Sequence, residues 1–67
     1  MRFAVRLKEL RLEKNIRVVD LAKETGMSKS ILYAYEKEER EPPATAVIRL
    51  ARFFGVTTDY ILGEKDY

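Results

Sequence analysis

The segment from residue 28 to residue 37 carries side chains that are suited to binding an anionic polymer. At about 100° per residue, a helix over this segment has one face of small, polar and basic residues: Lys29, Ser30, Tyr33, Ala34 and Lys37. Lysine and serine donate hydrogen bonds to phosphate oxygens and to base edges, and tyrosine can stack on a sugar or a base. The pattern indicates a nucleic-acid contact, and a plain solvated helix face remains the alternative.

The opposite face of this predicted helix is apolar, so the helix is expected to pack against a core. Ile31, Leu32 and Tyr35 point together there, and Tyr35 is expected to keep its hydroxyl at the edge of the core. Ser28 precedes the helix and is a preferred residue type for an N-cap. Because helix N-termini also bind anions, Ser28 is in addition a candidate phosphate contact.

The residues before this helix predict a tight corner that would hold it in place. A shorter helix is expected from about residue 18 to residue 25, and Gly26 ends it in the left-handed conformation. Leu21 and Ala22 share its inner face, and the small Ala22 lets the two helices approach closely. Two helices joined in this way form a helix-turn-helix, whose second helix lies in the major groove of DNA.

Three further helices complete the predicted fold. The first is expected over residues 3–14 and is ended by Asn15. The second follows Pro42 and Pro43 and is ended by Gly55, and the third begins at Thr57 or Thr58 and is ended by Gly63. No segment alternates with period two for long enough to predict a strand. The predicted fold class is therefore all-α, with five short helices around one core in a single domain over residues 1–67.

The composition argues against catalytic and metal-binding chemistry. The sequence has no histidine, no cysteine, no metal-ligand spacing and no glycine loop for a phosphate, so we expect no enzyme, no metal and no cofactor. No effector domain is visible, and no small-molecule effector is evident from the sequence. Without cysteines for disulfides or an apolar run near the roughly 20 residues of a membrane span, we expect a cytoplasmic protein.

The net charge of +2 is distributed unevenly. Residues 1–17 hold six bases and two acids, and the rest of the chain holds seven bases and nine acids, which together give the totals of 13 and 11. A basic segment of this kind can face a polyanion, or it can be an ordinary solvated helix face.

These features together resemble the Cro- and phage-repressor-type helix-turn-helix domains, also called the Xre family. The resemblance covers residues 7–62 without a gap and rests on the stretches LKELRLEKN, DLAKETGMSKSILYAYE and REPP…IRLARFFGVTTDYIL. It implies a lambda-repressor-like fold and a sequence-specific DNA-binding regulator of transcription, more specifically a repressor. The resemblance also implies a homodimer that inserts the helix over residues 28–37 into the major groove of a two-fold symmetric operator.

The resemblance assigns roles to particular residues. The positions that usually meet DNA in this family map onto Lys29, Ser30, Tyr33 and Ala34, with Lys37 near the DNA backbone. Arg11 and Glu36 match the positions of a partly buried ion pair that links the first and third helices and orients the recognition helix. Such a pair is weak evidence for net stability.

Two departures from the family pattern bear on DNA affinity. The family often opens the second helix with Thr-Gln or Ser-Gln, where this chain has Arg17, which can itself hold a phosphate, and Val18, which cannot form such a hydrogen bond. Residues 36–41 read EKEERE, with four acids near the expected path of the phosphates. Lys37 and Arg40 offset these acids in part. We therefore expect weaker or more salt-sensitive binding, or a loop that turns its acids away.

The C-terminal part of the chain has more large apolar side chains than so small a core can hold: Phe53, Tyr60, Ile61 and Tyr67. One or two of them must lie outside the core, either as scattered surface aromatics or as a homodimer interface. With the acidic stretch, they also favour a second hypothesis. In that hypothesis the same fold is a protein-interaction module, antitoxin-like or anti-repressor, with weak DNA binding.

Overall fold

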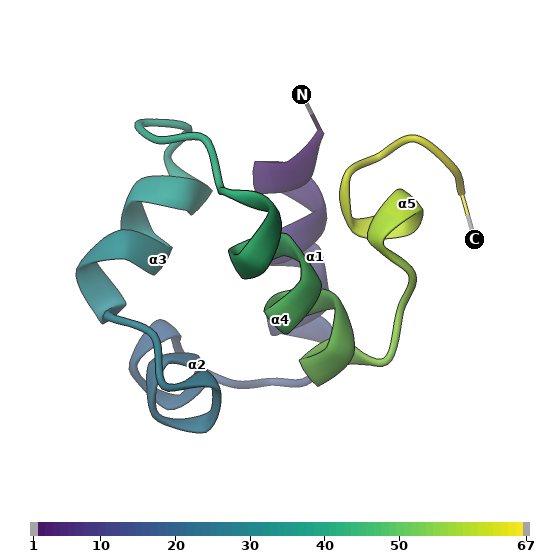
Figure 1. The fold of residues 1–67 in the computed structure, drawn as a ribbon. Helices are drawn as coiled ribbons and strands as arrows, with labels where there is room; N and C mark the ends of the chain where they lie inside the picture. The colour runs from purple at the N-terminus through teal and green to yellow at the C-terminus, as the bar shows by residue number, and fades with distance from the viewer. Residues whose placement is uncertain (1, 67) are drawn as a thin grey trace.

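The chain folds into five helices, which confirms the all-α prediction. The computed structural model describes residues 2–66, and no strand occurs among them. The helices are α1 (Phe3–Glu13), α2 (Val18–Thr25), α3 (Lys29–Glu36), α4 (Ala44–Phe54) and α5 (Thr58–Ile61). In Figure 1, α4 lies in front of α1, with α2 and α3 on one side of this pair and α5 on the other. None of the helices in residues 2–66 has the length and apolar character needed to cross a lipid bilayer.

Local chemistry places the helix ends close to their predicted positions. Ser28 caps α3, because its hydroxyl oxygen accepts a hydrogen bond at 3.2 Å from the backbone N–H three residues later. Thr57, and not Thr58, caps α5 in the same way at 3.0 Å. Asn15 and Gly26, with φ of 59° and 72°, adopt the left-handed conformation that ends α1 and α2.

The centre of the core is built from one fully buried aliphatic side chain of each helix. These are Leu7, Leu21, Leu32, Leu50 and Ile61, in the order α1 to α5. Tyr35 is also buried, as predicted, and its ring meets the ring of Phe3 edge to face with the centroids 5.8 Å apart. Because every helix contributes to the same centre, the core fixes the position of all five.

The C-terminal apolar residues differ from the prediction in one respect. Ile61 is fully buried and therefore offers no surface to a second copy of the chain. The reason is geometric, because α5 is a single turn and its inward position falls on Ile61. Phe53 and Tyr60 are half-buried, and Tyr67 lies outside the described residues.

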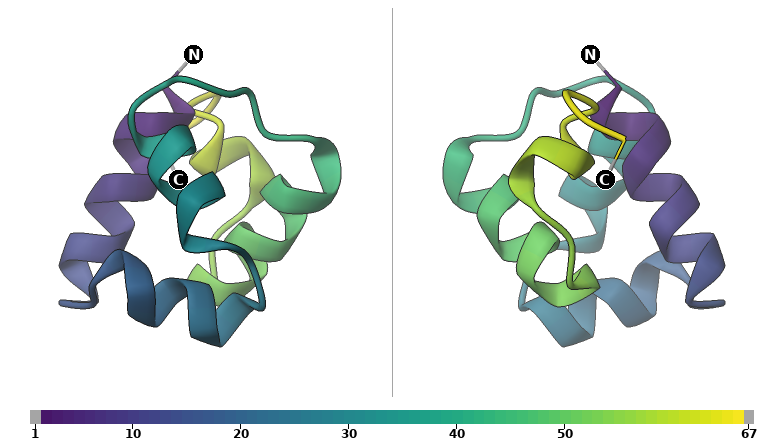
Figure 2. Two further views of the ribbon diagram at one scale, coloured as in Figure 1. Left: turned by 90° about the vertical axis from the view of Figure 1, so that its left-hand side faces the viewer. Right: turned by 90° about the vertical axis from the view of Figure 1, so that its right-hand side faces the viewer.

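Helices α2 and α3 form the predicted helix-turn-helix. The N–H groups of Gly26 and Met27 both donate to the carbonyl oxygen of Ala22, at 2.9 and 3.2 Å, which closes the turn between the two helices. In the left view of Figure 2, α2 runs along the lower edge and α3 lies in front, between α1 and α4. The outer face of α3 is therefore at the surface of the domain.

Two leucine-to-alanine substitutions in α1 test this core. Leu7→Ala should lower the free energy of unfolding by about 2–5 kcal/mol, because it opens a cavity where no solvent reaches. Leu12→Ala is the matched control, since Leu12 is 58% exposed, and it should change stability by less than about 0.5 kcal/mol. Urea unfolding of both variants measures the difference, and equal losses would contradict the assigned core.

Candidate nucleic-acid interface

The outer face of α3 brings together five of the side chains that the sequence predicted there. They are Lys29, Ser30, Tyr33 and Lys37, which are exposed, and Ala34, which is half-buried. Tyr33 is 48% exposed, a large aromatic surface to leave in water. The opposite side of α3 is anchored by buried residues, so the outer face is presented from a fixed helix.

A cation lies close to the exposed aromatic ring on this face. The Lys37 ammonium nitrogen is 6.0 Å from the centroid of the Tyr33 ring, one helical turn away. The pair combines a π surface with a positive charge at one place. Such a combination suits double-stranded DNA, where the ring can pack on a sugar or a thymine methyl group and the ammonium group can bind a phosphate.

A nearly buried ion pair ties α3 to α1 and confirms the pairing of Arg11 with Glu36. Arg11 Nε donates to Glu36 Oε2 at 2.7 Å, and Nη2 donates to Oε1 at 3.1 Å. The side chains are only 12% and 8% exposed. The remaining terminal nitrogen, Nη1, donates to the Ile16 carbonyl oxygen at 2.9 Å. One guanidinium thus joins α1, the segment just before α2 through Ile16, and the last turn of α3.

The Arg11–Glu36 pair also affects the titration of its cation. The hydrogen bonds to Glu36 raise the pKa of Arg11 above its ordinary value, and the negative charge of Glu36 adds to this, while burial acts in the opposite direction. Arg11 is therefore harder to deprotonate than a free arginine, so its guanidinium carries its charge in the pair at neutral pH.

A second ion pair lies at the start of α2 and had not been expected from the sequence. Arg17 Nε and Nη2 donate to the two carboxylate oxygens of Asp20 at 3.1 and 3.2 Å, and the Arg17 backbone N–H donates to Oδ2 at 3.0 Å. These bonds lower the pKa of Asp20, with the side-chain bond as the largest cause. An acid three residues after an N-cap position was the signal available in the sequence.

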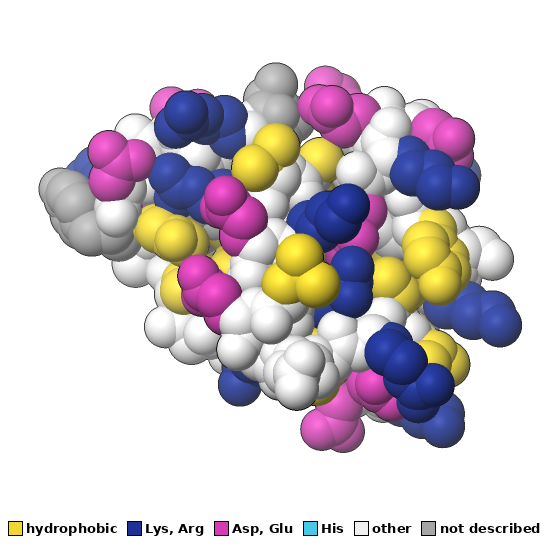
Figure 3. Space-filling view, turned by 180° about the vertical axis from the view of Figure 1, so that it is seen from behind, with side chains coloured by type: hydrophobic (Ala, Val, Ile, Leu, Met, Phe, Trp, Pro, Cys, Tyr) yellow, Lys and Arg dark blue, Asp and Glu magenta, His cyan; other side chains and the backbone are white. Residues whose placement is uncertain are grey.

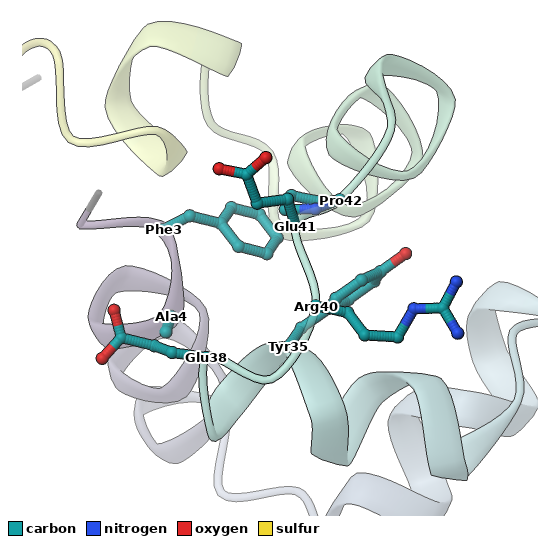
Figure 4. Close-up of a pocket in the computed structure, with 7 residues that line it drawn as sticks. All are labelled: Phe3, Ala4, Tyr35, Glu38, Arg40, Glu41 and Pro42. Atoms are coloured by element: carbon teal, nitrogen blue, oxygen red, sulfur yellow. The ribbon is translucent and has the colours of Figure 1, made fainter.

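Arg40 lies apart from the other predicted contacts. It lines a pocket of about 150 Å³ with Tyr35, Phe3 and the two acids Glu38 and Glu41. In Figure 4, Glu38 points toward α1, whereas Arg40 points to the other side of the loop, past Tyr35. Arg40 is thus beside the buried face of α3 and not on its outer face.

Part of the basic character of residues 1–17 is taken up by ion pairs of Arg6, Arg11 and Arg17, whereas Arg2, Lys8 and Lys14 are exposed. Arg6 is only 9% exposed, and it donates to the carbonyl oxygens of Tyr60 and Lys65 at 2.9 and 3.2 Å and to the Asp66 carboxylate at 3.0 Å. Its guanidinium carbon also lies 4.2 Å from the Tyr60 ring centroid. On the face opposite to that of Figure 1, acidic and basic side chains are interspersed (Figure 3).

Comparison with known proteins places the chain in a family. The pattern of the helix-turn-helix family matches residues 7–61. The chain belongs to this family. The resemblance to Cro-like and Xre-type domains is thereby confirmed, and the matched residues include the whole of α2 and α3.

Several helix-turn-helix relatives have names that describe regulators. The chain is 38% identical over 64 residues to an uncharacterized HTH-type transcriptional regulator, YobD, of Bacillus subtilis. It is 28% identical over 64 residues to RstR, a cryptic phage CTXphi transcriptional repressor of Vibrio cholerae, and 34% identical over 61 residues to an uncharacterized HTH-type transcriptional regulator, MJ0272, of Methanocaldococcus jannaschii. These names describe regulators and not enzymes.

The extent of the matches differs among these relatives. The matches to YobD and RstR each cover 96% of this chain, but only 57% of YobD and 58% of RstR. The match to MJ0272 covers 91% of this chain and 92% of MJ0272. The chain thus spans little more than half the length of the first two. No solved structure matches the chain with significance.

Breaking the Arg11–Glu36 pair from one side should be more harmful than removing it altogether. Glu36→Ala should cost about 3–5 kcal/mol, because the buried guanidinium loses its counter-charge, whereas Arg11→Met with Glu36→Leu should cost less. Thermal unfolding measures both, with Glu39→Ala as a control at an exposed acid of the same region. A double variant that is as unstable as Glu36→Ala would contradict this account.

Proposed function

We propose that this chain is a sequence-specific DNA-binding regulator of transcription, in particular a repressor, that inserts α3 into the major groove. The observation that carries the proposal is the outer face of α3, which is polar, exposed and presented from a helix fixed by the Arg11–Glu36 pair. The names of the helix-turn-helix relatives support the same function. A single domain over residues 1–67 and a cytoplasmic location belong to this proposal.

The proposed contacts divide into those that specify sequence and those that supply affinity. Lys29, Ser30 and Tyr33 reach the base edges from the first turns of α3, with Ala34 beside them. Arg17 and Lys37, together with the helix start at Ser28, contact phosphates. Arg40 lies in the loop after α3, away from the outer face of that helix, so in this proposal it serves only as a contact to the DNA backbone beside the groove.

The proposed active form is a homodimer on a two-fold symmetric operator. Two copies reading half-sites about 34 Å apart require a shared interface. Phe53 and Tyr60 remain candidates for it, because both are half-buried, whereas Ile61 is excluded by its burial. Phe53 packs edge to face against Phe54, which is also half-buried in α4.

A protein-interaction module on the same fold is the second candidate function. Exposed apolar side chains on α1, Val5 and Leu12, favour it, because they could meet a partner protein. The loop acids Glu38, Glu39 and Glu41 are all exposed and would weaken DNA binding. A stable one-to-one complex with a co-expressed partner, together with no gel shift at low salt, would favour this candidate.

Selection from a pool of random duplexes tests the proposal directly. The protein is incubated with the pool at about 50 mM and about 200 mM salt, and the bound DNA is sequenced. We expect an enriched palindrome, with half-sites one helical turn apart, that persists at the higher salt. Binding that is independent of sequence and lost at the higher salt would contradict specific recognition.

Two substitutions on α3 should separate base reading from phosphate binding. Tyr33→Ala should relax the base preference, and Lys37→Ala should weaken binding to all sequences alike and reduce the salt slope by about 0.9. Tyr33→Phe is the control that keeps the ring and removes the hydroxyl. Titration of the selected duplex and of a scrambled duplex gives both readouts. An equal loss on both duplexes for Tyr33→Ala would exclude a reading role for this residue.

A further inference from the structure

We propose that Asp20 restrains the DNA affinity of this domain by holding the Arg17 guanidinium, which must leave Asp20 to bind a phosphate. The inference rests on the proposed function, in which Arg17 contacts the DNA backbone at the start of α2. It gives a role in DNA binding to an acid that lies outside the recognition helix.

Asp20 occupies the same edge of the guanidinium that a phosphate would use. Arg17 Nε and Nη2 donate to Oδ2 and Oδ1 at 3.1 and 3.2 Å, so both oxygens of the carboxylate are engaged along one side. Arginine holds phosphates through the same kind of paired hydrogen bonds. The carboxylate and a phosphate therefore compete for one set of donors.

The ion pair between Arg17 and Asp20 can break without disturbing α2. The Asp20 carboxylate also accepts the Arg17 backbone N–H at 3.0 Å, so it is fixed at the start of α2, and its side chain is 35% exposed. The Arg17 side chain is 78% exposed and can rotate away on its own. Exposed ion pairs contribute little free energy, so separating Arg17 from Asp20 costs little. The positive charge of Lys23 stays near the Asp20 carboxylate after the Arg17 side chain has moved away.

The structure also fixes where Arg17 lies relative to α3. The carbonyl oxygen of the preceding residue, Ile16, accepts a hydrogen bond from Arg11 at 2.9 Å, and the same guanidinium holds Glu36 in the last turn of α3. The start of α2 therefore keeps its position when α3 lies in a groove. Arg17 would meet the DNA backbone at a defined place, so that a change at Asp20 acts on one contact.

Removing the charge of Asp20 should change both the DNA affinity and its dependence on salt. The Arg17–Asp20 pair has no net charge, so a phosphate that approaches it displaces few counterions. Asp20→Asn keeps an oxygen that can accept the Arg17 backbone N–H, and it leaves the guanidinium as a free cation. We expect this variant to bind DNA about fivefold more tightly, with a log–log salt slope that is steeper by about 0.9.

The experiment compares the wild type, Asp20→Asn, Arg17→Ala and the double variant on the duplex selected from the random pool, between about 50 and 200 mM salt. Arg17→Ala should cost more in the Asp20→Asn background than in the wild type, by the same factor of about five. Glu24→Gln is the matched control, because Glu24 is an exposed acid of the same helix. It should leave the affinity nearly unchanged. Circular dichroism confirms that each variant is folded.

The outcomes separate this inference from the proposed function. If the wild type binds DNA but Asp20→Asn binds equally well, or if Glu24→Gln gives the same gain, the role of Asp20 is overturned and DNA binding stands. Equal losses for Arg17→Ala in both backgrounds would overturn it as well. If none of the variants binds any duplex, the proposed function and the role of Asp20 fail together.

Discussion

The arrangement of the helix-turn-helix depends on one nearly buried guanidinium. A cation removed from water must find acceptors for its hydrogen bonds, and Arg11 finds them in the Glu36 carboxylate and the Ile16 carbonyl oxygen. These bonds join α1, the residue before the N-cap of α2 and the end of α3, and so hold the three segments at a defined spacing. The pair therefore acts as a constraint on geometry, and its contribution to net stability is a separate matter.

The fold separates the residues that stabilise it from those available for recognition. Each helix gives one fully buried aliphatic side chain to a common centre, whereas the outer face of α3 contributes little to that core. Lys29, Ser30 and Tyr33 are exposed, so they can change without opening a cavity. Helix-turn-helix domains can thus keep one scaffold while the recognised sequence differs.

The charge of the sequence and the charge available at the surface are different quantities. Arg6 and Arg11 are nearly buried in contacts with the C-terminal segment and with Glu36, and Arg17 is paired with Asp20. A bound carboxylate cancels the field that a phosphate would feel, so the formal charge of residues 1–17 overstates their attraction for DNA. In the proposed function, DNA affinity depends on which basic side chains of the protein are already paired with carboxylates. Lys29 and Lys37, on the outer face of α3, are exposed and available to DNA.

The sequence by itself determined the helices and the faces of α3, because caps, left-handed residues and a period of 3.6 act over a few neighbouring positions. Ser28 and Gly26 are examples, and family resemblance added the pairing of Arg11 with Glu36. Only the tertiary structure decided that Arg6 turns inward, since its acceptors lie 54 to 60 residues away along the chain. It likewise decided that Ile61 fills the core, because a single-turn helix has one inward position and the packing of the other four helices selects the residue that takes it.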